Sequence, residues 1–120
     1  MNRETVINIP LKRGSIWWAN LGNPHGNVQG GTRPVLVLGS RTALKFGTTV
    51  TVVPITSKIK RIDMSVHVTG FNYKKKQPCM ALCEQITTIS KESLLEPISS
   101  IKFNLVEIDV AIKEELGIEI

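Results

Sequence analysis

The chain has 120 residues, 42% of them hydrophobic, and a formal net charge of +5. This length suits one domain over residues 1–120 with a single core. We expect residues 1–11 of this domain to be a loose N-terminal lead. No apolar run approaches the roughly 18 residues that a spanning helix needs, and residues 1–10 lack the apolar stretch of a signal peptide, so we expect a cytoplasmic protein without a membrane segment.

The charge is unevenly distributed along the chain. Residues 1–91 contain 13 Lys or Arg and 3 Asp or Glu, whereas residues 92–120 contain 2 and 7. The basic part has two clusters, at 58–61 and 74–76. Such clusters attract phosphate backbones without reading sequence, although two solvated basic loops would have the same composition. The sequence favours a nucleic-acid partner for the basic part and a separate surface for the acidic end.

Strands dominate the expected secondary structure. Runs of β-branched and aromatic residues predict strands at 15–20, 34–39, 48–56, 65–68, 78–89 and 98–102. The second run is apolar on both faces, which predicts a central strand. The connections are a Gly- and Asn-rich loop at 21–32, a helical turn at 40–46, a basic loop at 57–65 and a lysine-rich turn at 69–77.

Only the C-terminal end has a helical period. Asn104 stands where an N-cap is expected, with Glu107 three residues later, and apolar residues then recur at spacings of three and four. Gly117 follows the last of them, at the position that usually ends a helix. Many short strands followed by one helix predict a mainly β protein, a small bent sheet or barrel with the helix packed on it.

The two cysteines are predicted to be buried thiols. Cys79 and Cys83 fall in one expected strand and on one of its faces, with Ala81 between them, a poor geometry for a disulfide. Two cysteines without nearby histidines make a weak metal site. We therefore predict no metal ligands and no cofactor.

Two strand ends carry the candidate chemistry. Gly30 and Gly31 precede Arg33, whose guanidinium keeps its charge and has five N–H donors in a fixed fork. The next strand ends in Thr56 and Ser57, just before the basic loop. A surface arginine after a turn would explain the first stretch equally well by itself, and the hydroxyls of the second stretch favour a site.

Four separated motifs resemble the MazF/PemK toxins of bacterial toxin–antitoxin systems. They are Arg13-Gly14-x-Ile16, Gln29-Gly30-Gly31-x-Arg33-Pro34-Val35-Leu36-Val37, Ile55-Thr56 and Glu84-Gln85-Ile86-x-Thr88-Ile89. The resemblance runs from Lys12 to Gly117 and implies an SH3-like β-barrel with a C-terminal helix. It also implies a homodimeric, metal-independent endoribonuclease of single-stranded RNA, held in check by a MazE-like antitoxin whose extended tail covers the RNA groove.

The same resemblance implies roles for individual residues. Arg33 and Thr56 match the catalytic arginine and threonine, Gln85 matches a glutamine near the RNA, and Asn27 lies where the family often has a serine. Further RNA-binding candidates lie near Arg33 or Thr56 in sequence: Gln29, Ser57, Lys58, Lys60 and Arg61. The sequence departs from the family pattern at Ser15, Asn20 and Thr87, which leaves the base preference open.

The implied reaction is attack of a ribose 2′-OH on the adjacent phosphate, giving 2′,3′-cyclic phosphate and 5′-OH ends. Arg33 would stabilise the phosphoryl charge, and Thr56 would position the phosphate or the 2′-OH. Arginine is a poor general base because its pKa exceeds about 12. His25 is an alternative base, and an ordinary loop histidine is the simpler interpretation of it. His67 is predicted to be structural.

Two points stay open at this level. Trp17 and Trp18 point to opposite faces of a strand, so at most one of them faces solvent. A non-catalytic barrel of the same kind, which binds nucleic acid or poisons a protein target such as a topoisomerase, is the alternative function.

Overall fold

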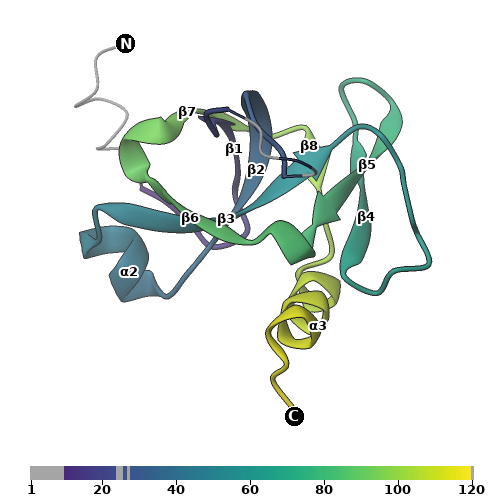
Figure 1. Ribbon diagram of the computed structural model, residues 1–120. Coiled ribbons are helices and arrows are strands. Elements are labelled where there is room, and N and C mark those ends of the chain that lie inside the picture. Colours follow the sequence, from purple (N-terminus) through teal and green to yellow (C-terminus); the bar gives the residue numbers. More distant parts are fainter. Residues whose placement is uncertain (1–9, 24–25, 27, 120) are drawn as a thin grey trace.

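Short antiparallel strands and a C-terminal helix form the part of the chain that this computed structural model describes, residues 10–23, 26 and 28–119 (Figure 1). The strands are β1 (Ile16–Asn20), β2 (Thr32–Leu38), β3 (Thr49–Thr56), β4 (His67–Asn72), β5 (Gln77–Leu82), β6 (Thr87–Ser90), β7 (Leu94–Ile98) and β8 (Ile101–Lys102). The helices are α2 (Arg41–Phe46) and α3 (Leu105–Leu116), with 3-10 turns η1 (Cys83–Gln85) and η2 (Lys91–Ser93). Most of the expected lead at 1–11 lies outside the described residues.

The strands form one strongly bent sheet in the order β7-β1-β2-β3-β5-β4-β8, with β6 also paired to β3. The bend follows β3, because residues 49–52 pair with β6 whereas Ile55 and Thr56 pair with β5. Strands β7 and β8 end the order, so the sheet is not closed. The expected SH3-like, mainly β architecture with a C-terminal helix is confirmed as an open barrel.

Strand β2 is buried on both faces. Leu36 and Leu38 belong to a hydrophobic cluster that α3 covers, whereas Val35 and Val37 belong to a second cluster around Trp17. Alternate residues of a strand point to opposite faces, so one strand supplies both clusters. Its pairing with β1 and β3 confirms the predicted central strand.

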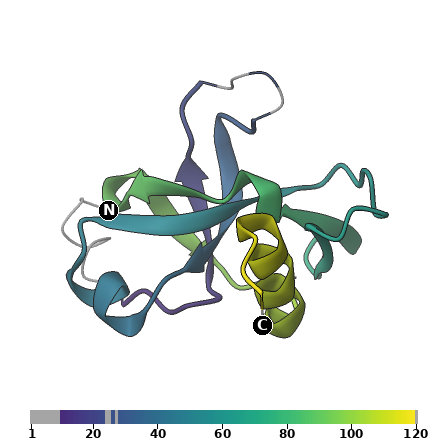
Figure 2. The ribbon, with the colours of Figure 1, turned by 60° about the horizontal axis from the view of Figure 1, so that its bottom comes forward.

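Helix α3 begins and ends where the sequence predicts. The side-chain oxygen of Asn104 accepts hydrogen bonds from the backbone N–H groups of Val106 and Glu107, and Gly117 ends the helix with φ of +68°. The helix lies against one face of the sheet (Figures 1 and 2). Arg13, just before β1, pairs with Asp109 of α3. Neither α3 nor any other described helix is long and apolar enough to cross a membrane.

Two predicted elements have different bounds in the structure. The strand expected at 65–68 is β4 at His67–Asn72, and the turn expected from 69 is confined to 73–76. The side-chain oxygen of Asn72 accepts hydrogen bonds from the N–H groups of Lys74 and Lys75, which starts the turn later than composition suggests.

The prediction of one long strand at 78–89 is wrong. The structure divides it into β5 and β6, separated by η1, because the two halves pair with different parts of β3. Strand β7 was not predicted. Of its five residues only Leu94 is buried, and its pairing with β1 is irregular between Trp18 and Ala19, so it lacks the usual alternation.

Candidate functional site

The start of β2 and the end of β3 lie at the same edge of the sheet. The two strands are antiparallel, and their register pairs Val35 with Pro54. The β2–β3 pairing ends at this pair, and Thr56 then pairs with Met80 of β5, so Arg33 and Thr56 each stand two residues beyond the same end of the pairing. Residues two apart in a strand share a face, so both side chains belong to the face of Val35 and Pro54. The fold therefore brings the two predicted catalytic residues to one edge.

Arg33 is half-buried and anchored to the loop before it. Its Nε donates a hydrogen bond to the carbonyl oxygen of Gly30 at 2.8 Å. Gly31 has φ of +71°, a conformation that glycine adopts at little cost, and its N–H donates to the carbonyl of Gly22 across the base of the loop. The terminal N–H groups of Arg33 make no hydrogen bond to another described residue, so they can bind a phosphate oxygen.

Thr56 is buried, with 4% of its surface exposed. Its hydroxyl oxygen accepts a hydrogen bond from the N–H of Lys58 at 3.1 Å, which shapes the exit of the chain into the basic loop. The hydroxyl can still donate its own proton. Thr56 thus has a structural role in the turn, and its catalytic role stays a prediction.

The basic loop expected at 57–65 spans residues 57–66 in the structure and presents its predicted RNA-binding residues to solvent. Ser57, Lys58, Lys60 and Arg61 are all exposed. Arg61 is engaged by Asp63 through two hydrogen bonds of 3.1 Å, so this arginine is partly neutralised. The exposed lysines are therefore the main positive charges of the loop.

Gln85 and Gln29 are joined to each other. The side-chain oxygen of Gln85, on η1, accepts a hydrogen bond from the backbone N–H of Gln29 at 2.7 Å. This bond spans 56 positions of sequence and fixes the loop before β2. Two of the predicted RNA-binding residues thus meet beside the edge that carries Arg33.

Sequence reasoning gave Glu84 no role, although it stands in one of the family motifs. Its Oε2 lies 2.6 Å from Nε2 of His67, whose side chain is 3% exposed. The Nδ1 of His67 lies 3.1 Å and 3.0 Å from the carbonyl oxygens of Lys60 and Arg61. His67 is structural, as predicted, and it holds the basic loop. The signal that could have found the pair is a carboxylate placed two residues after the end of a buried strand.

The other positions singled out in the sequence do not form one group in the described structure. His25 and Asn27 lie outside the described residues. The side chain of Asn20 accepts a hydrogen bond from the N–H of Gly22 and so shapes the start of the loop. Ser15 lies at the opposite end of β1 and donates to the carbonyl of Lys12, and Thr87 is exposed on β6.

The cysteines are buried free thiols, as predicted. Burial raises the pKa of Cys79 to about 11 and, helped by the charges of Glu84 and Glu115, the pKa of Cys83 to about 12. Among residues 10–23, 26 and 28–119, no group of three His, Cys, Asp or Glu side chains is placed to hold a metal ion.

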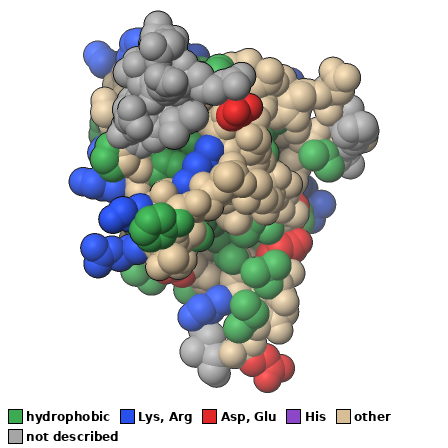
Figure 3. Space-filling view, turned by 90° about the vertical axis from the view of Figure 1, so that its left-hand side faces the viewer, with side chains coloured by type: hydrophobic (Ala, Val, Ile, Leu, Met, Phe, Trp, Pro, Cys, Tyr) green, Lys and Arg blue, Asp and Glu red, His purple; other side chains and the backbone are tan. Residues whose placement is uncertain are grey.

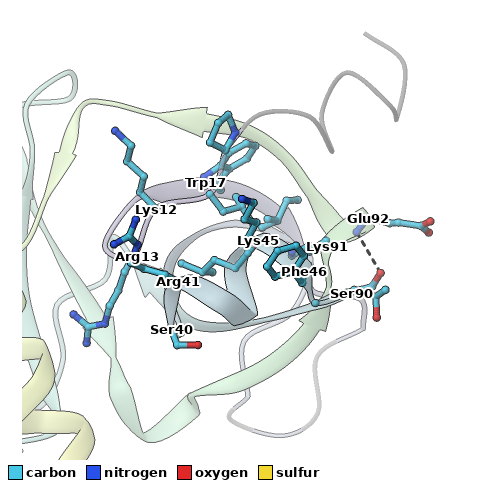
Figure 4. A pocket seen from close by; sticks show the side chains of 17 residues that line it. Lys12, Arg13, Trp17, Ser40, Arg41, Lys45, Phe46, Ser90, Lys91 and Glu92 are labelled. Atoms are coloured by element: carbon cyan, nitrogen blue, oxygen red, sulfur yellow. Dashed lines mark hydrogen bonds between the residues drawn. The ribbon is translucent and has the colours of Figure 1, made fainter.

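A cavity of about 1160 Å³ lies at the other end of β2 and β3 (Figure 4). Trp17 and Leu44 line it, and Lys12, Arg41 and Lys45 reach around it. Figure 3 shows Lys and Arg side chains gathered on this side of the molecule. None of the predicted site residues lines the cavity, so its cations are separate from those at the Arg33 edge.

Comparisons with known proteins agree with this architecture. Residues 12–114 match the model of PemK-like, MazF-like toxins of type II toxin–antitoxin systems. The chain is 32% identical over 111 residues to endoribonuclease MazF of Staphylococcus epidermidis, an alignment that covers 90% of this chain and 92% of that protein.

Solved structures with the same fold include MazF of Deinococcus radiodurans, with a TM-score of 0.72 at 20% identity over 92% of this chain and 99% of that one. A second is a MazE–MazF structure from the same organism, with a TM-score of 0.68 at 19% identity over 93% of this chain and 100% of that one. Because the family model covers most of the chain and the curated relative aligns along nearly its whole length, this chain belongs to the PemK/MazF toxin family of type II toxin–antitoxin systems.

Proposed function

We propose that this chain is a cytoplasmic, metal-independent and sequence-selective endoribonuclease of single-stranded RNA. The observation that supports the proposal is that Arg33 and Thr56 each stand two residues beyond the same end of the β2–β3 pairing, where the Gln29 loop and the basic loop begin or end. Positive grooves flanked by adaptable loops are typical of proteins that hold single-stranded RNA.

In the proposed reaction the 2′-oxygen of a ribose loses its proton and bonds to the adjacent phosphorus, while the bond from phosphorus to the 5′-oxygen of the next nucleotide breaks and that oxygen takes up a proton. The products are a 2′,3′-cyclic phosphate and a 5′-OH. The terminal N–H groups of Arg33 bind the phosphoryl oxygens as their charge increases, which lowers the barrier. The hydroxyl of Thr56 donates to a phosphoryl oxygen and keeps the attacking and leaving oxygens in line.

The proposed assembly is a homodimer neutralised by a MazE-like antitoxin. A similar solved structure contains both MazE and MazF, which supports an antitoxin partner of that class. The basic loop and its exposed lysines would suit an acidic antitoxin segment as well as RNA. Size-exclusion chromatography with light scattering, alone and with the antitoxin of the neighbouring gene, tests both parts.

The activity is tested with a long, end-labelled single-stranded RNA in the presence of EDTA. Wild-type protein should yield discrete fragments with cyclic phosphate and 5′-OH ends. Arg33→Ala should cut at least about 100-fold more slowly, the usual loss when one group that stabilises an oxyanion is removed. Thr56→Val should also lose activity, whereas Thr56→Ser keeps the hydroxyl and should retain it. Intact RNA after incubation with folded wild-type protein would contradict the proposal.

One observation favours the alternative, a barrel that binds nucleic acid or a protein target without cutting. Thr56 is nearly inaccessible and already serves the turn at Lys58. A non-catalytic protein would bind RNA in a salt-dependent way without product, and its toxicity would survive Arg33→Ala. The labelled-RNA assay therefore separates the two functions.

A further inference from the structure

The turn η1 is bonded to both loops that flank the Arg33 edge. Gln85 holds the loop before β2 directly, through the N–H of Gln29. Glu84, the residue next to it, holds the basic loop through His67, which contacts the carbonyls of Lys60 and Arg61. Two consecutive side chains on one 3-10 turn thus reach two segments that are far apart in sequence.

The contacts of His67 require a shared proton. Its Nδ1 faces two carbonyl oxygens, which only accept, so Nδ1 carries hydrogen. Its Nε2 faces a carboxyl oxygen of Glu84 at 2.6 Å, so one more proton lies between the two residues. An imidazolium with a carboxylate and a neutral imidazole with a neutral carboxyl both satisfy this geometry. In either form the pair is a short hydrogen bond that tethers the two residues, and in the ionic form it is charge-assisted and therefore stronger.

The tether is kept although it leaves a polar atom unsatisfied. The Oε1 of Glu84 is buried and makes no hydrogen bond within the described part of the chain. A buried carboxyl oxygen without a partner destabilises the folded state. A residue that is unfavourable in this way and still bonded to a functional loop is a candidate for a role in function.

We propose that Glu84 and Gln85 are positioning residues that hold the two RNA-facing loops in register on either side of Arg33 and Thr56. This inference rests on the proposed function for its effect on cutting, and on the hydrogen bonds alone for its effect on the loops. Gln85 acts through the backbone of Gln29, and Glu84 acts through His67. Each tether holds one loop, so the loops can be loosened separately.

The first test uses RNA-free protein and amide hydrogen exchange read by mass spectrometry. Gln85→Met removes the accepting oxygen at similar length and should speed exchange in residues 28–32 about 5- to 10-fold, the loss of one hydrogen bond. Glu84→Met should do the same in residues 57–66 and leave 28–32 unchanged. Gln85→Glu and Glu84→Gln keep an acceptor and should restore protection. Gln77→Met, at an exposed glutamine of β5, is the matched control and should change neither loop.

The second test measures cutting of RNA by the same variants. Each loosened loop should reduce kcat/KM about 5- to 10-fold and relax base preference on one side of the cut only, a different side for each variant. Wild-type exchange rates in both loops of the Met variants would overturn the inference, whatever the activity. Absence of cutting by the wild type would contradict the proposed nuclease and leave the exchange result to decide the tethers.

Discussion

The lysine-rich turn between β4 and β5 should bind RNA beyond the cut site. The bonds from Asn72 fix the turn, and its three exposed lysines project from it beside Tyr73, which is 62% exposed. Thr56 pairs with Met80, and β5 begins three residues earlier. The end of β3 lies at the Arg33 edge. At about 3.3 Å per residue, the turn therefore begins about 10 Å beyond that edge.

The size of the effect follows from counterion release. Each phosphate contact with a single strand contributes about 0.7 to the slope of log K against log salt, so three lysines contribute about 2. Replacing Lys74, Lys75 and Lys76 by Gln should reduce the slope by that amount. Between about 50 and about 200 mM salt, the advantage of the wild type over the variant should then shrink about 20-fold.

Fluorescence anisotropy with a 2′-O-methyl RNA, which lacks the attacking hydroxyl, measures this slope without cutting. The matched control replaces Lys12, Arg41 and Lys45, which line the distant cavity, by Gln and lowers the net charge equally. The control should leave the slope within about 0.5 of the wild type, since distant charges contribute little beyond a Debye length of about 10 Å. Equal slopes for the two triple variants would refute a specific contact at the turn.

Three further predictions concern stability and reactivity. Burial lowers the pKa of His67, but its hydrogen bonds to Glu84 and to two backbone carbonyls raise this pKa by more than burial lowers it. The pKa in the folded protein therefore lies above the usual value near 6.5. The stabilisation that protonated His67 gives the folded state is therefore complete below about pH 6.5 and is lost as pH rises through the folded pKa. Between pH 6 and pH 9, urea titrations should show a larger fall in the free energy of unfolding for the wild type than for His67→Gln, and equal falls would contradict this. Native protein should resist iodoacetamide at pH 8 because burial raises the pKa of Cys83 to about 12, whereas unfolded protein should react at once; rapid native labelling counts against it. Gly70→Ala should lower the free energy of unfolding by about 1–3 kcal/mol, because the new Cβ would lie 2.5 Å from the ring of Phe103 and 2.6 Å from the backbone carbonyl oxygen of Lys102; an unchanged urea midpoint would contradict this.

The parts of the fold that sequence predicted are those with local causes. Helix α3 is predictable because the side chain of Asn104 caps its first turn and Gly117 adopts the left-handed conformation that ends it. Both effects act within a few residues. Residues 35–38 of the central strand β2 are apolar because both faces of this part of the strand are covered. Strand β7 was not predicted because only Leu94 of its residues is buried, so it lacks an alternating apolar pattern. It is a strand because it pairs with β1.

The candidate site was predictable to the same extent. The glycines before Arg33 and the hydroxyl at Thr56 are visible in sequence, and antiparallel pairing of neighbouring strands is enough to bring them to one edge. The bond between Gln85 and Gln29 was not predictable, because a side-chain oxygen that accepts from a backbone N–H leaves no pattern in either segment.

The missed break in the sheet and the missed tethers have one physical cause. Strand β3 continues through the bend, so its first half needs β6 as a partner and its end needs β5. A single extended strand cannot follow both halves, and the chain turns at η1 to change position. Side chains on that turn no longer alternate between two faces of a sheet, which frees Glu84 and Gln85 to reach the two loops. The bend that makes the sheet barrel-like thus also creates the point from which the loop before β2 and the basic loop are held.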